Sequence, residues 1–362
     1  MNADSRPVLI MAGGTGGHVY PALAVARELM AQRVPVVWLG TRNGIEARVV
    51  PAAGIPIHWL QISGLRGKGL AALLVPIKLL LACLQAAWVI LRRQPRVVLG
   101  MGGYAAAPGG LMCRLLLKPL VIHEQNAVAG FTNRMLSKLA NSILQAFPNT
   151  FPAELHAYHT GNPVREDIAN IPLPDVRLSQ RKGRLRLLVI GGSQGSIFLN
   201  EIVPQAVATM PSGVWPEIRH QAGKGNLEAT QRLYQSKDIA AEVTTFIDDM
   251  AQAYAWADIV VCRAGAMTVA ELAAAGLPSI LVPFPQAVDD HQTRNARFLA
   301  DNGAAILANQ SKLTPEAMGD WLSELGVDRK RLLRMGQNAR GLARLDATRL
   351  VVKECLAVAE SF

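Results

Sequence analysis

The sequence has little of several features that define common protein classes. Only 18% of its 362 residues are charged, and its four cysteines are far apart with no CxxC pair. This argues against a disulfide scaffold or a zinc ribbon and favours a reducing compartment. Aromatic residues make up 5%, which weakens a base-stacking nucleic-acid interface. The apolar run at Val8–Ala12 is shorter than the core of a signal peptide, so export is not expected.

Two phosphate-handling motifs are also missing. No G-x4-G-K-[ST] segment occurs, which excludes a P-loop NTPase. Asp248–Asp249 and Asp289–Asp290 are adjacent pairs, unlike the DxD spacing with which some glycosyltransferases hold a divalent ion. His156 and His159 form the one close histidine pair and lack acidic support, so no metal site is expected.

The length and charge of the chain indicate its general organisation. At 362 residues it exceeds what one hydrophobic core usually organises, which predicts two domains of about 180 residues each. Half of the residues are apolar, which excludes wholesale disorder. The net charge of +10 favours an anionic partner: nucleic acid, a phosphorylated substrate or an acidic membrane surface.

Short apolar runs alternate with helical patterns such as Pro21–Gln32 and Val269–Ala275, which is typical of doubly wound parallel sheets. The strands expected in the first half are Val8–Met11, Val36–Leu39, Val97–Leu99, Leu120–Ile122 and Ile143–Gln145. Those expected in the second half are Leu187–Ile190, Val243–Phe246, Ile259–Cys262, Ser279–Val282 and Ala304–Leu307.

The two halves also resemble each other. VLIMAGGTGG at Val8–Gly17 and LLVIGGSQGS at Leu187–Ser196 share the pattern strand, Gly-Gly, hydroxyl residue, any residue, Gly. We therefore expect two Rossmann-like α/β domains, residues 1–163 and 164–345, joined within the proline- and arginine-rich stretch Pro163–Arg186. The ligand should bind in a cleft that faces the carboxyl ends of both sheets.

Three glycine-rich segments, Gly13–His18, Gly100–Tyr104 and Gly191–Gly195, each follow an expected strand. Glycine permits close backbone approach, and the next helix N-terminus presents N–H groups to a phosphate. The alternative for each segment is an ordinary strand-to-helix turn.

Two sharper alternatives exist for these loops. Gly100-x-Gly102-x-x-Ala105 fits a dinucleotide fingerprint with Glu124 as its ribose acid, but Pro108–Gly110 is expected to interrupt the helix that should follow. Gly191-x-Ser193-x-Gly195 fits a hydrolase nucleophile elbow, with Asp289 and His291 as triad partners. Thr15 in the equivalent position of the first loop argues against the elbow.

Four further motifs, taken with these loops, closely resemble the MurG family. They are HEQNAVAGFTNR (His123–Arg134), TGNPVR (Thr160–Arg165), RAGAMTVAEL (Arg263–Leu272) and PFPQAVDDHQTRNA (Pro283–Ala296). The family is the UDP-N-acetylglucosamine:undecaprenyl-pyrophosphoryl-MurNAc-pentapeptide N-acetylglucosaminyltransferase of peptidoglycan synthesis. The resemblance implies a GT-B architecture, with residues 346–361 returning as a helix to the N-terminal domain. It also implies inverting transfer of GlcNAc from UDP-GlcNAc to the C4 hydroxyl of MurNAc in lipid I, which yields lipid II and UDP.

Inverting transfer needs a base for the acceptor hydroxyl and charge stabilisation for the leaving diphosphate. His18, which ends the first glycine loop, is the leading candidate for the base, and Glu124 is the rival. The alternative for His18 is a histidine at a helix start that only hydrogen-bonds the sugar or pyrophosphate. The identity of the base stays open at this point.

The resemblance assigns other residues to the substrates. Arg165 and the Ser193 loop would meet the donor diphosphate, and the backbone of Ile247 would read the uracil. The implied donor-binding residues are Thr15, Gly16, Gly17, Asn126, Arg165, Ser193, Ile247, Ala266, Met267, Thr268, Val269, Ala270, Glu271 and Gln292. Those implied for the acceptor pyrophosphate are Gly102, Gly103 and Tyr104. Arg165 could instead form an interdomain salt bridge, and Asn126 could simply form a turn.

Glu271 has two interpretations. The resemblance implies that its carboxylate accepts hydrogen bonds from the ribose hydroxyls. The spacing Thr268-x-x-Glu271 is also that of a capping box at a helix start, which the spacing alone favours.

Residues Leu70–Leu91 are nearly continuous apolar sequence, long enough to span a bilayer, but Pro76, Lys78 and Gln85 interrupt them. With flanking basic residues, this favours a helix lying on a membrane surface over one crossing it; a buried crossover helix is the alternative. The expected membrane contacts are Leu74, Leu81, Trp88, Arg92 and Arg93.

The resemblance places the protein peripherally on the cytoplasmic face of the bacterial inner membrane. Its implied partners are UDP-GlcNAc, lipid I, the anionic membrane and other cell-wall synthesis proteins, with no nucleic acid and no required cofactor or metal. The rival function is a non-catalytic protein that binds nucleotide sugars or lipid pyrophosphates on the same scaffold.

Overall fold

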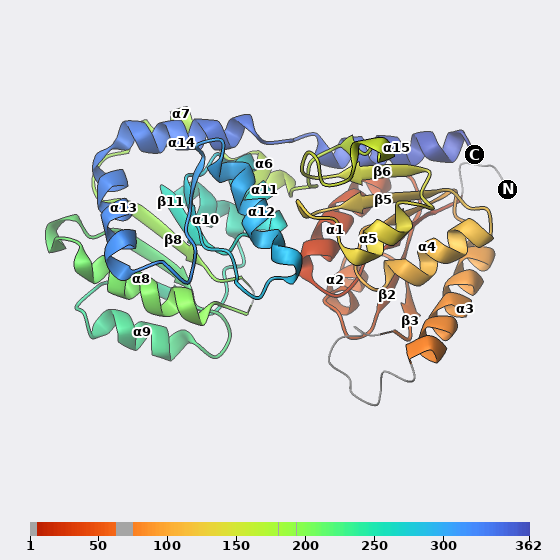
Figure 1. The fold of residues 1–362 in the computed structure, drawn as a ribbon, viewed down its shortest axis with the longest axis horizontal. Helices are drawn as coiled ribbons and strands as arrows, with labels where there is room; N and C mark the ends of the chain where they lie inside the picture. Colours follow the sequence, from red (N-terminus) through yellow and green to blue (C-terminus); the bar gives the residue numbers. More distant parts are fainter. Residues whose placement is uncertain (1–5, 63–74, 180, 193) are drawn as a thin grey trace. The chain divides into compact units, whose positions relative to one another are not determined.

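The computed structural model describes residues 6–62, 75–179, 181–192 and 194–362 (Figure 1). The chain divides into two compact units, one of Met1–Val164 with Arg344–Phe362 and one of Arg165–Ala343. Each unit is a parallel sheet with helices on its faces.

The first unit contains a seven-stranded sheet in the order β3-β2-β1-β4-β5-β6-β7, with all neighbouring strands parallel. The strands are β1 (Val8–Met11), β2 (Val36–Thr41), β3 (Ile57–Leu60), β4 (Val97–Gly100), β5 (Leu120–Glu124), β6 (Ser142–Gln145) and β7 (Tyr158–His159). Its helices are α1 (Gly16–Ala31), α2 (Glu46–Ala52), α3 (Val75–Arg93), α4 (Ala106–Leu115), α5 (Phe131–Leu136), η3 (Ala153–Leu155) and α15 (Ala347–Glu360). The strand order reverses between β1 and β4.

The second unit contains a six-stranded parallel sheet in the order β10-β9-β8-β11-β12-β13. The strands are β8 (Arg186–Ile190), β9 (Glu217–Gln221), β10 (Glu242–Thr244), β11 (Ile259–Cys262), β12 (Ser279–Leu281) and β13 (Ala305–Leu307). The longer helices are α8 (Ile197–Thr209), α9 (Leu227–Gln235), α10 (Met250–Trp256), α11 (Ala266–Ala275), α12 (His291–Ala300), α13 (Pro315–Val327) and α14 (Arg329–Gly341). The short ones are α6 (Glu166–Ala169), α7 (Pro174–Leu178), η4 (Ser212–Val214) and η5 (Val288–Asp290). Here the order reverses between β8 and β11.

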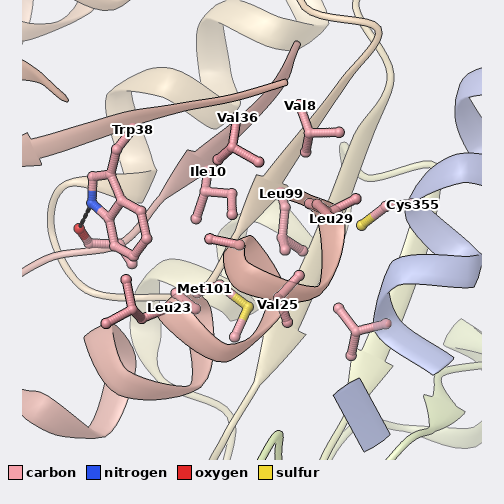
Figure 2. Packing of buried hydrophobic residues seen from close by; sticks show 14 of the residues in the cluster. Val8, Ile10, Leu23, Val25, Leu29, Val36, Trp38, Leu99, Met101 and Cys355 are labelled. Carbon is pink, nitrogen blue, oxygen red and sulfur yellow. Dashed lines mark hydrogen bonds between the residues drawn. The ribbon is translucent and has the colours of Figure 1, made fainter. Parts of the chain in front are cut away.

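The apolar strands are buried on both faces because helices cover each side of the sheet. Along β1, Val8 and Ile10 pack into one core cluster and Leu9 and Met11 into the other. Cys355 of α15 belongs to the first cluster, so the end of the chain completes the core of the first unit (Figure 2). Burying one such aliphatic side chain contributes about 1.5–3 kcal/mol, which explains why these runs form the central strands.

All ten expected strands are present, with bounds that differ by a few residues at most. Three further strands, β3, β7 and β9, were not predicted. β9 reads Glu-Ile-Arg-His-Gln, and its polar side chains hide it from a search for apolar runs. β7 has two residues, too few for any periodicity.

Two helices differ from expectation. α1 begins at Gly16 rather than at Pro21, which lies inside the helix. α4 runs unbroken through Pro108, Gly109 and Gly110, so the predicted interruption is wrong. Pro108 is the third residue of α4, where its backbone nitrogen would have no intrahelical partner. A side chain at Gly110 would collide with Leu136, so glycine lets α4 pack closely against α5.

The stretch Pro163–Arg186, expected to hold the join, is mostly part of the second unit. The units divide at Val164–Arg165, and α6 and α7 follow at once. Arg177, 8% exposed, donates to the carbonyl oxygens of Ala257, Ala275 and Gly276 (3.0, 2.9 and 3.0 Å), near the carboxyl ends of α10 and α11.

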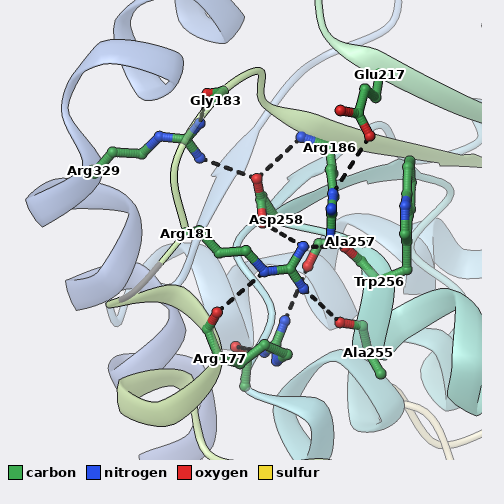
Figure 3. A network of polar contacts seen from close by, with 11 residues as sticks. Arg177, Arg181, Gly183, Arg186, Glu217, Ala255, Trp256, Ala257, Asp258 and Arg329 are labelled. Atoms are coloured by element: carbon green, nitrogen blue, oxygen red, sulfur yellow. Dashed lines mark hydrogen bonds and ion pairs between the residues drawn. The ribbon is translucent and has the colours of Figure 1, made fainter.

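Arg181 and Arg329 flank the buried carboxylate of Asp258 at 3.6 and 3.0 Å (Figure 3). The Asp258 carboxylate also accepts a hydrogen bond from the backbone nitrogen of Arg186 (3.1 Å), at the start of β8. The arginines of this stretch therefore stabilise the amino-terminal edge of the second sheet.

Candidate active site

The predicted site residues of the first unit gather where its strand order reverses. The glycine loop Gly13–Gly17 follows β1, Gly102 and Gly103 follow β4, and Gln125 follows β5, three neighbouring strands. In open parallel sheets, ligands bind at the carboxyl ends of the strands at such a reversal. Side chains added at Gly102 and Gly103 would lie 3.0 Å from the His18 ring and 2.6 Å from Gly13 O, so both glycines are needed for this close approach.

His18 lies in the first turn of α1 and is held by a buried amide. Its Nδ1 is 2.8 Å from Oε1 of Gln125, which is 1% exposed. The Gln125 Nε2 lies 3.0 Å from His123 Nδ1 and 3.1 Å from His123 O, and His123 Nε2 lies 3.0 Å from Gly161 O. Burial lowers the pKa of His123 to about 4, so this second histidine is neutral at physiological pH.

Glu124, the rival base, has a different environment. It is 2% exposed, and its carboxylate accepts four hydrogen bonds, all from the loop after β5 and the start of α5. Oε1 accepts from Asn126 N and Nδ2 (3.0 and 3.1 Å), and Oε2 from Gly130 N and Asn133 Nδ2 (3.0 and 2.8 Å). Glu124 and Asn126 thus hold each other, so the loop that carries the HEQN motif is built around this carboxylate.

The first glycine loop rests on Glu46, a residue that the sequence analysis did not single out. Its side chain is fully buried, and Oε2 accepts from Gly14 N (3.0 Å). Oε1 accepts from Thr41 N and Oγ1 (3.0 and 2.7 Å). An acid after the second strand is the position that binds ribose in dinucleotide-binding domains, which was the available signal. Here that carboxylate holds the loop instead.

The second glycine loop is shaped by backbone contacts and an arginine. Gly195 has φ +76°, and any side chain there or at Gly223 would collide with the opposite backbone. Ser196 caps α8, its Oγ accepting from Leu199 N (3.4 Å) and from Arg263 Nε (3.1 Å). The Arg263 NH1 also donates to Val282 O and Pro283 O (3.1 and 3.2 Å), which joins the ends of β8, β11 and β12. Ser193 lies outside the described residues.

Ala266, Met267, Thr268, Val269, Ala270 and Glu271 form the first part of α11. The cap of this helix is Gly265, with no side-chain hydrogen bond, so the capping box predicted for Thr268 and Glu271 is absent from the described hydrogen bonds. The helix starts two residues before Thr268, which places Thr268 in its first turn. The first backbone N–H groups of α11 therefore have no side-chain cap of their own.

Glu271 is partly buried, and its Oε2 accepts a hydrogen bond from the hydroxyl of the buried Tyr254 (3.0 Å). Burial raises the pKa of the Glu271 carboxyl, while the charge of Arg165 and the Tyr254 hydrogen bond act in the opposite direction. A carboxylate in this setting gains from ligand hydroxyls that replace its lost water.

The other predicted donor residues of the second unit lie on separate segments. Arg165 caps α6, and its Nε lies 4.0 Å from Asp167 Oδ1, within its own unit. Ile247 lies between β10 and α10 and is half-buried. Gln292 lies in the first turn of α12, and its Oε1 accepts from Phe284 N (2.9 Å).

α3 has a buried and an exposed apolar face. Ala82, Ala86, Val89 and Ile90 pack on the sheet, whereas Leu80, Leu84 and Trp88 are 61, 58 and 54% exposed. The exposed large apolar residues of the helix are Ile77, Leu79, Leu80, Leu81, Leu84, Trp88 and Leu91. Arg92 lies 5.2 Å from the Trp88 ring, and Arg93 Nε donates to His58 Nε2 (3.0 Å). Leu74 lies outside the described residues.

The described part of the chain has neither a metal-binding cluster nor a membrane-spanning helix. Among residues 6–62, 75–179, 181–192 and 194–362, no three His, Cys, Asp or Glu side chains are grouped to hold a metal ion. None of the helices described here is long and apolar enough to cross a membrane.

Comparisons with known proteins match nearly the whole chain. Residues 8–145 match the glycosyltransferase family 28 N-terminal domain, and residues 186–351 match the C-terminal domain of that family. These matches, with the two parallel sheets, confirm the predicted GT-B class of two Rossmann-like α/β domains. They leave no support for the dinucleotide fingerprint or the nucleophile elbow.

The chain is also similar to individual proteins over nearly its full length. UDP-N-acetylglucosamine--N-acetylmuramyl-(pentapeptide) pyrophosphoryl-undecaprenol N-acetylglucosamine transferases from Nitrosococcus oceani and Stutzerimonas stutzeri are 53 and 54% identical, covering 97% of this chain and 98% of theirs. The crystal structure of Acinetobacter baumannii MurG is 44% identical with a TM-score of 0.85, covering 97% of this chain and 99% of that one. The chain therefore belongs to glycosyltransferase family 28 and, within it, to the MurG family of N-acetylglucosaminyltransferases.

Proposed function

We propose that this enzyme transfers GlcNAc from UDP-GlcNAc to the C4 hydroxyl of MurNAc in undecaprenyl-pyrophosphoryl-MurNAc-pentapeptide, with inversion, to give lipid II and UDP. The observation that carries the proposal is the identity of more than 50% to transferases named for this reaction, over nearly the full length of both chains. The geometry of each unit supports a division of labour, with acceptor chemistry in the first unit and donor binding in the second.

His18 is the general base in this proposal. Its ring lies beside Gly102 and Gly103, the segment assigned with Tyr104 to the acceptor pyrophosphate. The surroundings of Glu124 argue against that residue as the base, because four donors already occupy the lone pairs of its carboxylate. A carboxylate so engaged has little capacity left to accept a hydrogen bond from the acceptor hydroxyl.

The donor binds to the second unit. Glu271 accepts from the ribose hydroxyls, the backbone of Ile247 binds the uracil, and the uncapped start of α11 with Arg165 meets the diphosphate. A helix N-terminus presents aligned N–H groups and a partial positive charge to such an anion. Asn126 and Gln292 are assigned to the donor sugar in this proposal, and Thr15, Gly16 and Gly17 to other parts of the donor.

No divalent ion is required in this proposal, because Arg165 and backbone N–H groups meet the diphosphate charge. The adjacent aspartates have other partners: Asp249 caps α10 through Gln252 N (2.8 Å), and Asp290 accepts from Thr293 Oγ1 (2.6 Å). Turnover should persist in EDTA. Complete loss, with recovery only on adding a divalent ion, would contradict this part of the proposal.

The exposed face of α3 binds the cytoplasmic face of the inner membrane. Arg92 and Arg93 end this apolar face with positive charge, and each basic residue near an anionic leaflet contributes about 1 kcal/mol. Replacing Leu81 and Trp88 by Ser should weaken binding to anionic vesicles and leave turnover of a short-chain acceptor intact. Val327→Ser, at an 80% exposed apolar residue of the other unit, is the matched control.

The decisive assay measures UDP release from UDP-GlcNAc with and without the lipid-linked acceptor. Acceptor-dependent release together with a disaccharide-lipid product is the expected outcome. Binding of UDP-GlcNAc without turnover would support the non-catalytic binding protein instead. Participation in cell-wall assembly with other proteins at the membrane follows from this reaction and is part of the same proposal.

A further inference from the structure

The hydrogen-bonded chain behind His18 has an additional consequence. It runs from His18 Nδ1 to Gln125 Oε1 (2.8 Å), from Gln125 Nε2 to His123 Nδ1 (3.0 Å), and from His123 Nε2 to Gly161 O (3.0 Å). Its two inner members, Gln125 and His123, are 1 and 0% exposed, so no bulk water competes for these contacts. Each link constrains where the next proton lies.

Gly161 O, at the far end of this series of hydrogen bonds, determines which atom donates in each of them. Gly161 O is a carbonyl oxygen and only accepts, so His123 Nε2 carries a hydrogen. Because burial keeps His123 neutral, its Nδ1 is then the acceptor and takes a hydrogen from the Gln125 amide. The second contact of Gln125 Nε2, to the carbonyl oxygen of His123 at 3.1 Å, requires the same amide orientation, since Oε1 in that place would face another acceptor.

The near end then follows. With its NH2 group turned to His123, Gln125 presents Oε1 to His18, and an amide oxygen only accepts. We infer that Gln125 and His123 are positioning residues that hold His18 in the Nδ1–H tautomer, so that Nε2 is the unprotonated nitrogen which takes the acceptor hydroxyl proton. This inference rests on the proposed function, because it specifies the basic atom of the proposed base.

The chemistry balances with this assignment. The hydroxyl oxygen of the acceptor bonds to the anomeric carbon, the bond from that carbon to the UDP oxygen breaks, and its electron pair leaves with UDP. The hydroxyl proton moves to His18 Nε2, which gives an imidazolium that later returns this proton to water. Gln125 Oε1 accepts from Nδ1–H throughout and stabilises the imidazolium as it forms.

Gly161, whose carbonyl oxygen ends this series of hydrogen bonds, is held in place by its neighbours. Gly161 has φ +82°, and a side chain there would collide with Arg344 and approach the Ala347 side chain to 3.5 Å. The next residue, Asn162, donates through Nδ2 to Gln125 O (2.9 Å). The returning carboxyl-terminal segment thus packs against Gly161, whose carbonyl oxygen orients His123.

The test reads the tautomer directly by 15N NMR of the full chain, labelled at its seven histidines, with His18→Ala and His123→Leu used for assignment. In the unmodified protein, His18 should show a protonated Nδ1 and an unprotonated Nε2, and His123 the reverse. Gln125→Met keeps the volume but removes the acceptor. It should shift His18 toward the Nε2–H form and lower kcat by about 10–100-fold, less than the roughly 10²–10⁴-fold worth of a base, with donor KM changed less than about twofold.

Two controls keep the test interpretable. Gln125→Glu retains an oxygen toward His18 and should keep the Nδ1–H signal, but its second oxygen faces the acceptors Nδ1 and O of His123, so kcat and the melting temperature should fall. Gln145→Met removes a buried glutamine of the neighbouring strand, whose amide binds Ala157 O, Thr150 N and Phe151 N, and should leave the His18 spectrum unchanged.

The outcomes separate the two proposals. If His18 is mainly in the Nε2–H form in the unmodified protein, the inference that Gln125 and His123 set its tautomer is wrong. The same holds if Gln125→Met leaves the His18 spectrum unchanged. Neither result would contradict the transferase function. Full turnover by His18→Ala would overturn the role of His18 as the base, whatever its tautomer.

Discussion

The two glycine-rich loops share a sequence pattern but have opposite charges behind them. The loop Gly13–Gly17 rests on the buried carboxylate of Glu46, which accepts from Gly14 N. The loop Gly191–Gly195 leads into Ser196, whose Oγ accepts from the guanidinium of Arg263. An anion beneath a loop disfavours a phosphate there, whereas a cation favours one. In the function that we propose, the same motif therefore carries the base in the first loop and meets the diphosphate in the second, and the charge that distinguishes them comes from a residue of another segment.

The largest expected effect tests the first loop. His18→Ala should lower kcat by about 10²–10⁴-fold with little change in UDP-GlcNAc binding. Steady-state kinetics and donor titration measure both. Glu124→Gln is the control and should mainly lower the melting temperature, because the four donors lose their carboxylate. If it abolishes turnover while His18→Ala costs less than about tenfold, the roles are reversed.

Acid should lower the free energy of unfolding of both units, because each unit contains a buried neutral histidine, His123 in the first and His220 in the second. Burial lowers the pKa of His123 to about 4 and that of His220 to about 3. Since the unfolded chain binds protons first, stability is fully present above pH 6.5 and is lost as pH falls toward these values. Each histidine accounts for a loss on the order of 3 kcal/mol in the free energy of unfolding. Urea titrations from pH 7.5 to 4.5 should show it, and His220→Gln should flatten the slope; an unchanged slope would contradict the prediction.

The third effect concerns the donor. Glu271→Ala should raise the donor KM by about 10–100-fold, since two ribose hydroxyls lose a charged acceptor. Because burial raises the pKa of this carboxyl, the charged form costs stability at neutral pH, so Glu271→Gln should keep or increase the melting temperature while it weakens donor binding. A loss confined to the melting temperature would make the residue structural.

Removing the charged residue behind each loop should affect UDP binding and stability differently in the two loops. Arg263→Met should weaken UDP binding about tenfold, measured by calorimetry. Glu46→Gln should alter UDP affinity less than about twofold, yet lower the free energy of unfolding by about 1–3 kcal/mol, because one N–H or hydroxyl donor loses its acceptor. Equal effects of both variants on UDP affinity would remove the distinction between the loops.

The smallest effect is that of Tyr254→Phe. It removes the hydroxyl that donates to Glu271 Oε2 at 3.0 Å and leaves the ring packing unchanged. The loss of one such hydrogen bond is worth about 0.5–1.5 kcal/mol, so the donor KM should rise about two- to tenfold, with kcat nearly constant. An unchanged donor KM would show that the carboxylate keeps its place without Tyr254.

Local sequence patterns predicted more of the fold than of the candidate site. Apolar runs such as Val8–Met11 and Ile259–Cys262 are buried on both faces and carry a strong signal, so these strands were predicted with their bounds. β9 escaped because its side chains are polar although its backbone pairs with β8 and β10. The interruption expected in α4 failed because close packing, not intrinsic propensity, decided that helix.

The sequence by itself determined the two-domain α/β class, the positions of the glycine loops and the candidates His18, Glu124 and Glu271. Those features depend on composition, periodicity and short motifs, which are local along the chain, and for Glu271 on the resemblance that these motifs carry. Only the tertiary structure decided the surroundings of each candidate. Glu124 is surrounded by donors, Glu46 holds the first loop, and Gln125 contacts both His123 and His18, which is 107 residues before Gln125 in the sequence. Hydrogen-bond partners so far apart are selected by the folded sheet, because burial makes each unpaired polar atom costly and so requires a specific partner.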